Sequence, residues 1–279
     1  MHQVSRHAVQ IVSDVITKLL AVAVADPGML CSFATALQLH ITNTMLDPEI
    51  RHVVLVSLDP RFDRHLAKAD NIRSLFLALN DEVFSNREAA MSIIGRVSSA
   101  NPAYVFPSLR KVLVQLLTEV EFSNLPRNKQ ESCRLISHLA ASASGLIKPY
   151  VEPMVHVLLP RAKETDESVA ALALRAIGDL TVIGGEEMVR YIPELMKVII
   201  DYLRDQGSHV KRSAALRTLG QLASNSGYVI EPYNDHPELL AMLINIVKAE
   251  PMGDLRRDTI RLIGILGALD PYKHQVRTV

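Results

Sequence analysis

The most informative segment of the chain reads Lys211-Arg212-Ser213-Ala214-Ala215-Leu216-Arg217-Thr218-Leu219-Gly220-Gln221-Leu222. Its apolar side chains follow the i, i+3, i+4, i+7 spacing that gathers them on one face of an α-helix. The basic side chains fall on other faces. A glycine inside a helix costs about 1 kcal/mol, so we expect Gly220 to be there because a neighbouring helix approaches closely.

Four other segments repeat this pattern, with a step of about 41 to 44 residues when aligned on the glycine, the range of HEAT or armadillo repeats. They are Arg87 to Gly95, Lys129 to Ser137, Ala170 to Gly178 and Arg256 to Gly264. One such unit is too small to bury its apolar face, so the units must stack. The sequence therefore predicts an all-α fold, an α-solenoid of HEAT-type helix pairs.

The repeat period sets the predicted boundaries along the chain. They are 1–58 for a first pair with an atypical insertion at 27–46, then 59–99, 100–143, 144–182, 183–225 and 226–268 for HEAT repeats, and 269–279 for the start of a further, truncated repeat.

The first pair combines a helix from about Val4 to Ala25 with a second from Glu49 to Leu58. We expect Ile11, Val12, Val15, Ile16, Leu19 and Leu20 on the buried side of the first helix. Residues 27–46 are too long and too apolar for a connection. They are either a genuine insertion, forming a loose helix or no structure, or an artefact of the gene model.

Later helices are predicted at 83–99, 104–122, 126–142, 147–159, 168–181, 186–204, 209–224, 237–249 and 253–266. The first helix of each pair carries a proline, at Pro107, Pro153, Pro193 and Pro237, and we expect each to bend its helix. Bent first helices favour HEAT over armadillo units.

An acid stands six residues before the basic repeat position in two units, Asp81 before Arg87 and Glu250 before Arg256. HEAT repeats often carry such a pair, which joins the turn of one unit to the next helix. Two departures are plain, since Ala170 has no charge and Ser137 replaces the glycine.

Composition limits the function classes. Thirty basic residues balance thirty acidic ones, which argues against general nucleic-acid binding. The two cysteines, Cys31 and Cys133, form no metal-type cluster and indicate an intracellular, reducing compartment. No signal peptide is expected, and charges interrupt the apolar runs before the roughly 18 residues that a membrane span needs.

The C-terminal part resembles a known family. The segments are Thr218-Leu219-Gly220-Gln221-Leu222, Ser226-Gly227-Tyr228-Val229-Ile230-Glu231-Pro232-Tyr233 and Ile263-Gly264-Ile265-Leu266-Gly267-Ala268-Leu269-Asp270-Pro271-Tyr272-Lys273-His274. They look like the N-terminal HEAT region of target-of-rapamycin (TOR) protein kinases. Leu77 to Asp81 and Gly184 to Met188 fit the same region.

The resemblance implies a large serine/threonine kinase whose catalytic domain, with its ATP and magnesium, lies outside this chain. It implies that the HEAT region holds protein subunits of TOR complexes, dimerises through the scaffold, and lies in the cytoplasm or at endomembrane surfaces. An independent HEAT adaptor, of the nuclear-transport or phosphatase-scaffold kind, is the alternative.

No catalytic, cofactor or metal site is expected within the chain. The loop, lysine and aspartates of a kinase are not arranged here, and Gly264 and Gly267 are expected inside a helix, where they serve close packing. His138 and His156 lack a third metal ligand, and Ser98, Ser99, Ser142 and Ser144 stand at helix ends. Glu186 and Glu187 are expected to cap a helix.

Docking anchors in the turns between repeats are the remaining candidates. Tyr228, Tyr233 and Tyr191 are either exposed anchors for a partner or tyrosines that pack within the array, and packing is the expected role.

Overall fold

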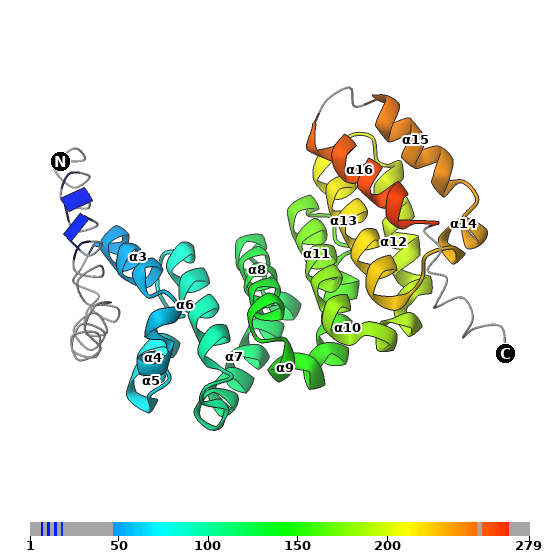
Figure 1. Cartoon of the computed structure of the whole chain (residues 1–279). Helices are drawn as coiled ribbons and strands as arrows, with labels where there is room; N and C mark the ends of the chain where they lie inside the picture. Colours follow the sequence, from blue (N-terminus) through cyan, green and yellow to red (C-terminus); the bar gives the residue numbers. More distant parts are fainter. Residues whose placement is uncertain are drawn as a thin grey trace. The chain divides into compact units, whose positions relative to one another are not determined.

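A computed structural model of the chain describes residues 47–249 and 253–267, together with positions 7, 10, 11, 14, 15 and 18. Every regular element in these residues is a helix (Figure 1). The predicted all-α class is therefore confirmed. The expected insertion at 27–46 and the truncated repeat at 269–279 lie outside the described residues, and the repeat boundaries remain a prediction.

The N-terminal helix differs from expectation at two positions. Ile11 and Val15 are 50% and 48% exposed, although both were predicted to be buried. They share a helical face with Gln10 and Asp14, whose side chains hydrogen-bond at 3.1 Å. The apolar spacing in this segment was therefore assigned to the wrong face at these two positions. Val12, Ile16, Leu19 and Leu20 lie outside the described residues.

The described helices form two compact units. The first unit comprises residues 1–115 and 141–146, and the second comprises 116–140 and 147–279. The helices of the first unit are α3 (Pro48–Ser57), η1 (Pro60–Phe62), α4 (Asp63–Leu66), α5 (Ala69–Ala78), α6 (Phe84–Val97) and the larger part of α7 (Pro102–Phe122). Helix α6 packs against α3, α4 and α5 around the fully buried Phe62, Leu75 and Met91.

The second unit begins within α7 and continues through the C-terminal helices. Its elements are α8 (Pro126–Ser142), η2 (Lys148–Tyr150), α10 (Val151–Arg161), α11 (Glu167–Gly184), η3 (Gly185–Tyr191), α12 (Ile192–Arg204), α13 (His209–Ser226), α14 (Glu231–Asp235), α15 (Leu239–Ala249) and α16 (Asp254–Ile265). The last residues of α8 and α9 (Ser144–Ile147) cross the division between the units.

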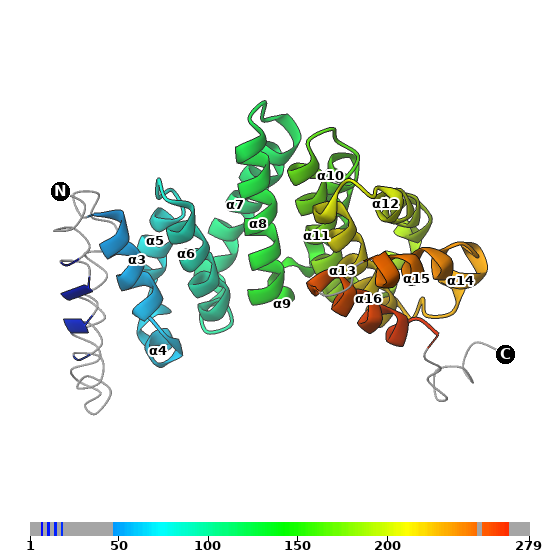
Figure 2. The same ribbon diagram turned by 90° about the horizontal axis from the view of Figure 1, so that it is seen from above.

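Packing in the second unit follows the predicted pairing. Helices α11, α13 and α16 lie side by side, and α10, α12 and α15 each pack on one of them (Figures 1 and 2). Helices α11, α13 and α16 thus form one row of a stack of helix pairs, and stacking is how such pairs bury their apolar faces.

Local signals in the sequence set the helix ends. The Asp166 and Ser208 side chains accept hydrogen bonds from the backbone N–H groups of Val169 and Lys211, at 2.8 and 3.0 Å, and so cap α11 and α13. Gly185 follows α11 with φ 50°, and Gly227 follows α13 with φ 71°. Only glycine adopts this left-handed conformation cheaply, so both helices stop there.

Most of the prolines do not act as predicted. Of these four prolines, only Pro107 lies beyond the first turn of its helix, whereas Pro193 occupies the first turn of α12 and Pro237 precedes α15. Pro153 lies in the first turn of α10, where a missing N–H breaks no helical hydrogen bond. Two of the first helices instead begin as 3-10 helices: η2 is followed directly by α10, and η3 is followed directly by α12.

Of the two glycines predicted to lie in a helix near the C-terminal end, only Gly264 does. Gly267 lies beyond α16 with φ 86°, so it is not a helical residue. Gly264 is helical, but a Cβ built on it would meet no atom within 4 Å among the described residues. The next predicted repeat, 269–279, lies outside the described residues, so close packing at Gly264 stays a prediction.

One stretch, Glu167–Arg204, is long and apolar enough to cross a membrane by length and composition alone. Of its most apolar window, 61% is buried inside the molecule. The positive φ of Gly185 and segment η3 also divide it into two helices. This stretch behaves as core helices α11 and α12, so it is weak support for a membrane span.

Candidate functional site

The residues considered as catalytic candidates lie on several different helices. His138 is half-buried in α8, and His156 is exposed in α10 with its ring edge-to-face with Tyr191 at 5.8 Å. The Ser98 hydroxyl is buried and donates to the carbonyl oxygen of Gly95 at 2.6 Å. Glu186 and Glu187 are exposed in η3. In the described part of the chain, no three His, Cys, Asp or Glu side chains are placed to hold a metal ion.

Cys133 is buried in α8, and burial raises the pKa of its thiol to about 12. The thiolate is the reactive form of cysteine, so this side chain is a neutral core residue at physiological pH.

A buried ion pair connects successive helices in the first unit. Arg51 of α3 donates from Nε to Asp81 Oδ2 at 2.8 Å and from a terminal nitrogen to Glu82 at 3.2 Å. Both the Arg51 and Asp81 side chains are 5% exposed. Burial alone would raise the pKa of Asp81, but hydrogen bonds from Arg51, Val83 and Asn86 lower it.

This pairing corrects the sequence interpretation. Asp81 was expected to pair with Arg87, six residues later, yet its partner is Arg51, thirty residues earlier. Arg87 instead lies over the ring of Phe84, at 5.3 Å from the ring centre. The acid therefore reaches back to the preceding helix pair. Glu250, of the second predicted pair, lies outside the described residues.

The second unit contains an equivalent pair. Lys129 of α8 donates to Glu164, in the turn before α11, at 2.7 Å, and Arg161 donates to the same oxygen at 2.6 Å. Burial would raise the pKa of Glu164, but these two cations lower it. Glu164 stands six residues before Ala170, the repeat position that carries no charge. This repeat therefore has the acid of the acid–base pair but not the base. Lys129, one of the two basic partners of Glu164, comes from the preceding repeat.

The tyrosine candidates are mainly packing residues. Tyr228 is 9% exposed, its hydroxyl donates to Asp235 at 2.6 Å, and burial together with that carboxylate raises its pKa. Tyr233 is half-buried and lies beside Gly267. The Tyr191 hydroxyl is buried without a hydrogen-bond partner in the described structure. Tyr228 cannot act as an exposed anchor without breaking its hydrogen bond to Asp235.

An exposed surface on α7 was missed by the sequence reading. Phe106, Pro107, Arg110, Lys111 and Val114 line a hollow of about 620 Å³ in the first unit. Val114 is 58% exposed and Phe106 38%. We call these five residues the α7 surface. Apolar side chains flanked by two cations suit a partner with apolar and acidic groups.

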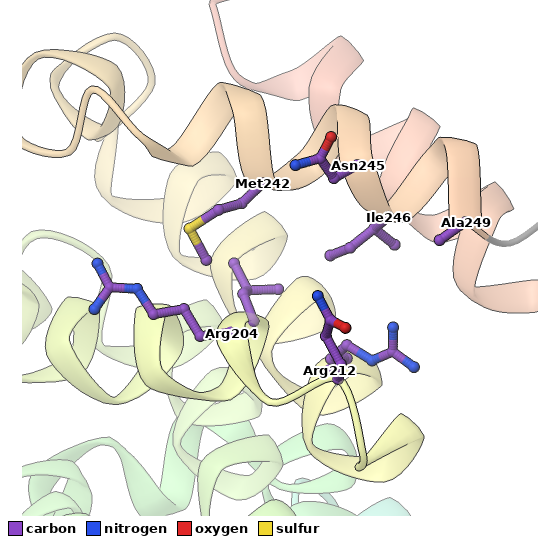
Figure 3. A pocket seen from close by; sticks show the side chains of 8 residues that line it. Arg204, Arg212, Met242, Asn245, Ile246 and Ala249 are labelled. Carbon is purple, nitrogen blue, oxygen red and sulfur yellow. The ribbon is translucent and has the colours of Figure 1, made fainter.

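A second hollow, of about 430 Å³, lies where α15 faces the turn between α12 and α13. Figure 3 shows Met242, Asn245 and Ile246 of α15 facing Arg204 and Arg212 across it. Arg204 pairs with Glu238 at 3.3 Å. Apolar side chains alternate with polar ones around this hollow, and no converging acid and base mark it as catalytic.

Solved structures define the class of protein to which this fold belongs. Over 98% of this chain, the fold matches 34% of the karyopherin Kap121p bound to Pho4p, with a TM-score of 0.65 and 13% sequence identity. At that identity the likeness is one of fold. The chain is therefore an α-solenoid of the helical-repeat class.

Sequence comparison identifies the family. The family model described as the serine/threonine-protein kinase mTOR domain matches residues 229–279. Serine/threonine-protein kinase TOR2 of Saccharomyces cerevisiae is 50% identical over 98% of this chain, and the mTor kinase of Drosophila melanogaster is 40% identical over 95%. The chain spans about 10% of the length of either relative. It belongs to the target-of-rapamycin kinase family, as part of the N-terminal HEAT region.

Proposed function

We propose that this chain is a non-catalytic scaffold segment of a target-of-rapamycin serine/threonine kinase. It docks subunits of the kinase complex and positions a distant kinase domain in nutrient and growth signalling. The observation that carries the proposal is 50% identity to one such kinase, sustained over 98% of this chain but over only 10% of the relative.

The scattered candidate residues support a non-catalytic role. Phosphoryl transfer needs metal-binding carboxylates brought together, and no three His, Cys, Asp or Glu side chains of the described residues are placed to hold a metal ion. ATP and magnesium would then be bound elsewhere in the kinase. The isolated chain should transfer no phosphate.

The partners we propose are protein subunits of the complex and a second copy of the same kinase, met in the cytoplasm or at endomembrane surfaces. The α7 surface supports protein docking because it combines exposed apolar side chains with Arg110 and Lys111. Kap121p, which shares the fold, was solved with Pho4p bound, and this favours a binding role for the fold here.

Introducing a negative charge on the α7 surface tests the docking role. In the full-length kinase, Val114→Glu places an acid where we expect acidic and apolar partner groups, so co-purification of complex subunits should fall several-fold. Val56→Glu is the matched control, since Val56 is 63% exposed on α3 and Val114 is 58% exposed on α7. Both variants are compared by quantitative mass spectrometry and by kinase activity on a peptide.

If Val114→Glu retains every subunit at the level of the unaltered kinase, the α7 surface is not a docking site. If either exposed substitution abolishes kinase activity on an isolated peptide without loss of any subunit, the segment affects chemistry directly and the scaffold proposal fails.

A further inference from the structure

An arginine recurs at one register position in four second helices. Each of Arg134, Arg175, Arg217 and Arg261 stands three residues before the repeat glycine position, which is Ser137, Gly178, Gly220 or Gly264. They lie on α8, α11, α13 and α16, and all four belong to the second unit. Because α11, α13 and α16 pack side by side, equivalent positions form a line across them. We call these four residues the arginine column.

Hydrogen bonds join the two helices that carry Arg175 and Arg217. Arg175 donates to Ser213 of α13 at 3.1 Å, and Arg217 donates back to Asp179 of α11 at 3.1 Å. Burial lowers the pKa of Arg175, and the positive charges of Arg217 and Arg134 lower it further. Three guanidinium groups on three helices therefore share one electrostatic neighbourhood.

One donor of Arg175 has no acceptor among the described residues. A guanidinium group carries five N–H donors, and the Nε of Arg175 is buried with no hydrogen-bond partner among the described residues. Asp179 is already shared between Arg217 and Gln221, which donates to it at 2.7 Å. The Arg134, Arg217 and Arg261 side chains are exposed, so their guanidinium groups are the ones that an acceptor from outside the chain can reach.

We propose that the arginine column binds an extended acidic segment of a partner protein, with carboxylates at about every third residue. This deepens the proposed docking function and rests on it. Packed helices lie about 8–10 Å apart, and an extended polyproline-type chain rises about 3.1 Å per residue and returns to the same face every third residue. Acids at that spacing would meet arginines on consecutive helices.

A nucleic acid fits the column less well. Asp179 and Asp258 lie among the arginines and would repel a continuous phosphate backbone. No Phe or Tyr stands one helical turn from any of the four arginines, so bases would find no stacking partner. Spaced carboxylates avoid both difficulties.

Binding is tested on purified protein that contains the whole chain. The probe is a fluorescein-labelled peptide of Glu-Pro-Pro triplets, and its isomer with all glutamates contiguous is the first control, both followed by fluorescence anisotropy. Arg175→Gln should weaken binding of the triplet peptide by about tenfold. Arg134→Gln combined with Arg261→Gln removes two exposed charges and should weaken it by about five- to tenfold.

Arg190→Gln combined with Lys197→Gln is the matched control variant. It removes two exposed charges from η3 and α12, the first-helix side of the array, and should leave binding unchanged. The salt dependence of binding should be shallower in the column variants alone. Arg175→Gln could lower the melting temperature so far that binding cannot be measured. In that case, binding by the double variant Arg134→Gln, Arg261→Gln tests the proposal.

Equal binding by the column variants and the unaltered protein would overturn the proposal. So would binding of the contiguous isomer, or of a single-stranded oligonucleotide of equal charge, as tightly as the triplet peptide. These results are independent of subunit loss at the α7 surface, so the two proposals can fail separately.

Discussion

Helix α13 packs against α11 on one side and α16 on the other, and the two contacts are built differently. At α11, a Cβ on Gly178 would overlap the Gln221 side chain and lie 2.9 Å from Thr218 Oγ1. At α16, a Cβ on Gly220 would lie 3.7 Å from Leu262 and 3.8 Å from Ile265, which is ordinary contact. Glycines at the equivalent position of two successive repeats thus serve different purposes.

The difference comes from what the facing helix carries. Thr218 donates to the Leu174 carbonyl oxygen at 3.1 Å, and Gln221 donates to Asp179 at 2.7 Å, so polar side chains bridge α13 to α11. They reach α11 because Gly178 leaves space. The side of α13 that faces α16 meets leucine and isoleucine, which adapt to the available distance.

Gly178→Ala should have the largest effect. Its methyl group would meet backbone as well as side chain, since Thr218 Cα lies 3.2 Å from the built Cβ. Overpacking of this kind costs about 1–3 kcal/mol, only partly offset by the better helix propensity of alanine. We expect a lower melting temperature by circular dichroism, with faster hydrogen exchange in α11 and α13. An unchanged melting temperature would show that the contact is looser than its geometry indicates.

Thr218→Val should come next, at about 1 kcal/mol of destabilisation, because it removes a buried hydrogen bond while keeping the shape of the side chain. Thr218→Ser keeps the hydroxyl and removes the methyl group, so it separates the hydrogen bond from packing. Chemical denaturation of the three proteins gives the two contributions. Greater destabilisation by serine than by valine would assign the contact to packing instead.

Gly220→Ala should act in the opposite direction. The space beside Gly220 admits a methyl group, and alanine is the better helix former, so we expect stabilisation of up to about 1 kcal/mol. Measured beside Gly178→Ala under identical conditions, it reverses the sign of the effect at an equivalent repeat position. If both substitutions destabilise equally, the two contacts do not differ as described.

The sequence predicted the second helices well and the first helices less well. Residues 126–142 were predicted as a helix and form α8, and 209–224 matches α13 within two residues. Periodic apolar spacing and capping residues are local, so they can be read directly. Residues 186–204 were predicted as one helix, yet η3 precedes α12. Gly185 has a positive φ at the start of η3, and Pro193 lies in the first turn of α12.

The candidate sites show the same division. The arginine column could have been found from the sequence, since aligning the repeats on their glycine places Arg134, Arg175, Arg217 and Arg261 in register. The α7 surface and the true partner of Asp81 could not, because they depend on which helices lie beside one another. Arg51 and Asp81 are thirty residues apart, and nothing local joins them.

Arg217→Gln should have the smallest effect on the contact between α13 and α11. The Arg217 side chain is 56% exposed, and Gln221 still donates to Asp179 when the arginine is removed. Exposed ion pairs contribute about 0.2–1 kcal/mol, so we expect less than about 0.5 kcal/mol, decreasing further in high salt. The same substitution should weaken binding of the triplet peptide several-fold, because the arginine would then be absent from the column. Loss of peptide binding with unchanged denaturation would separate the ligand-facing role of this arginine from its structural one, whereas strong destabilisation would place Arg217 with Thr218 among the residues that hold α13 to α11.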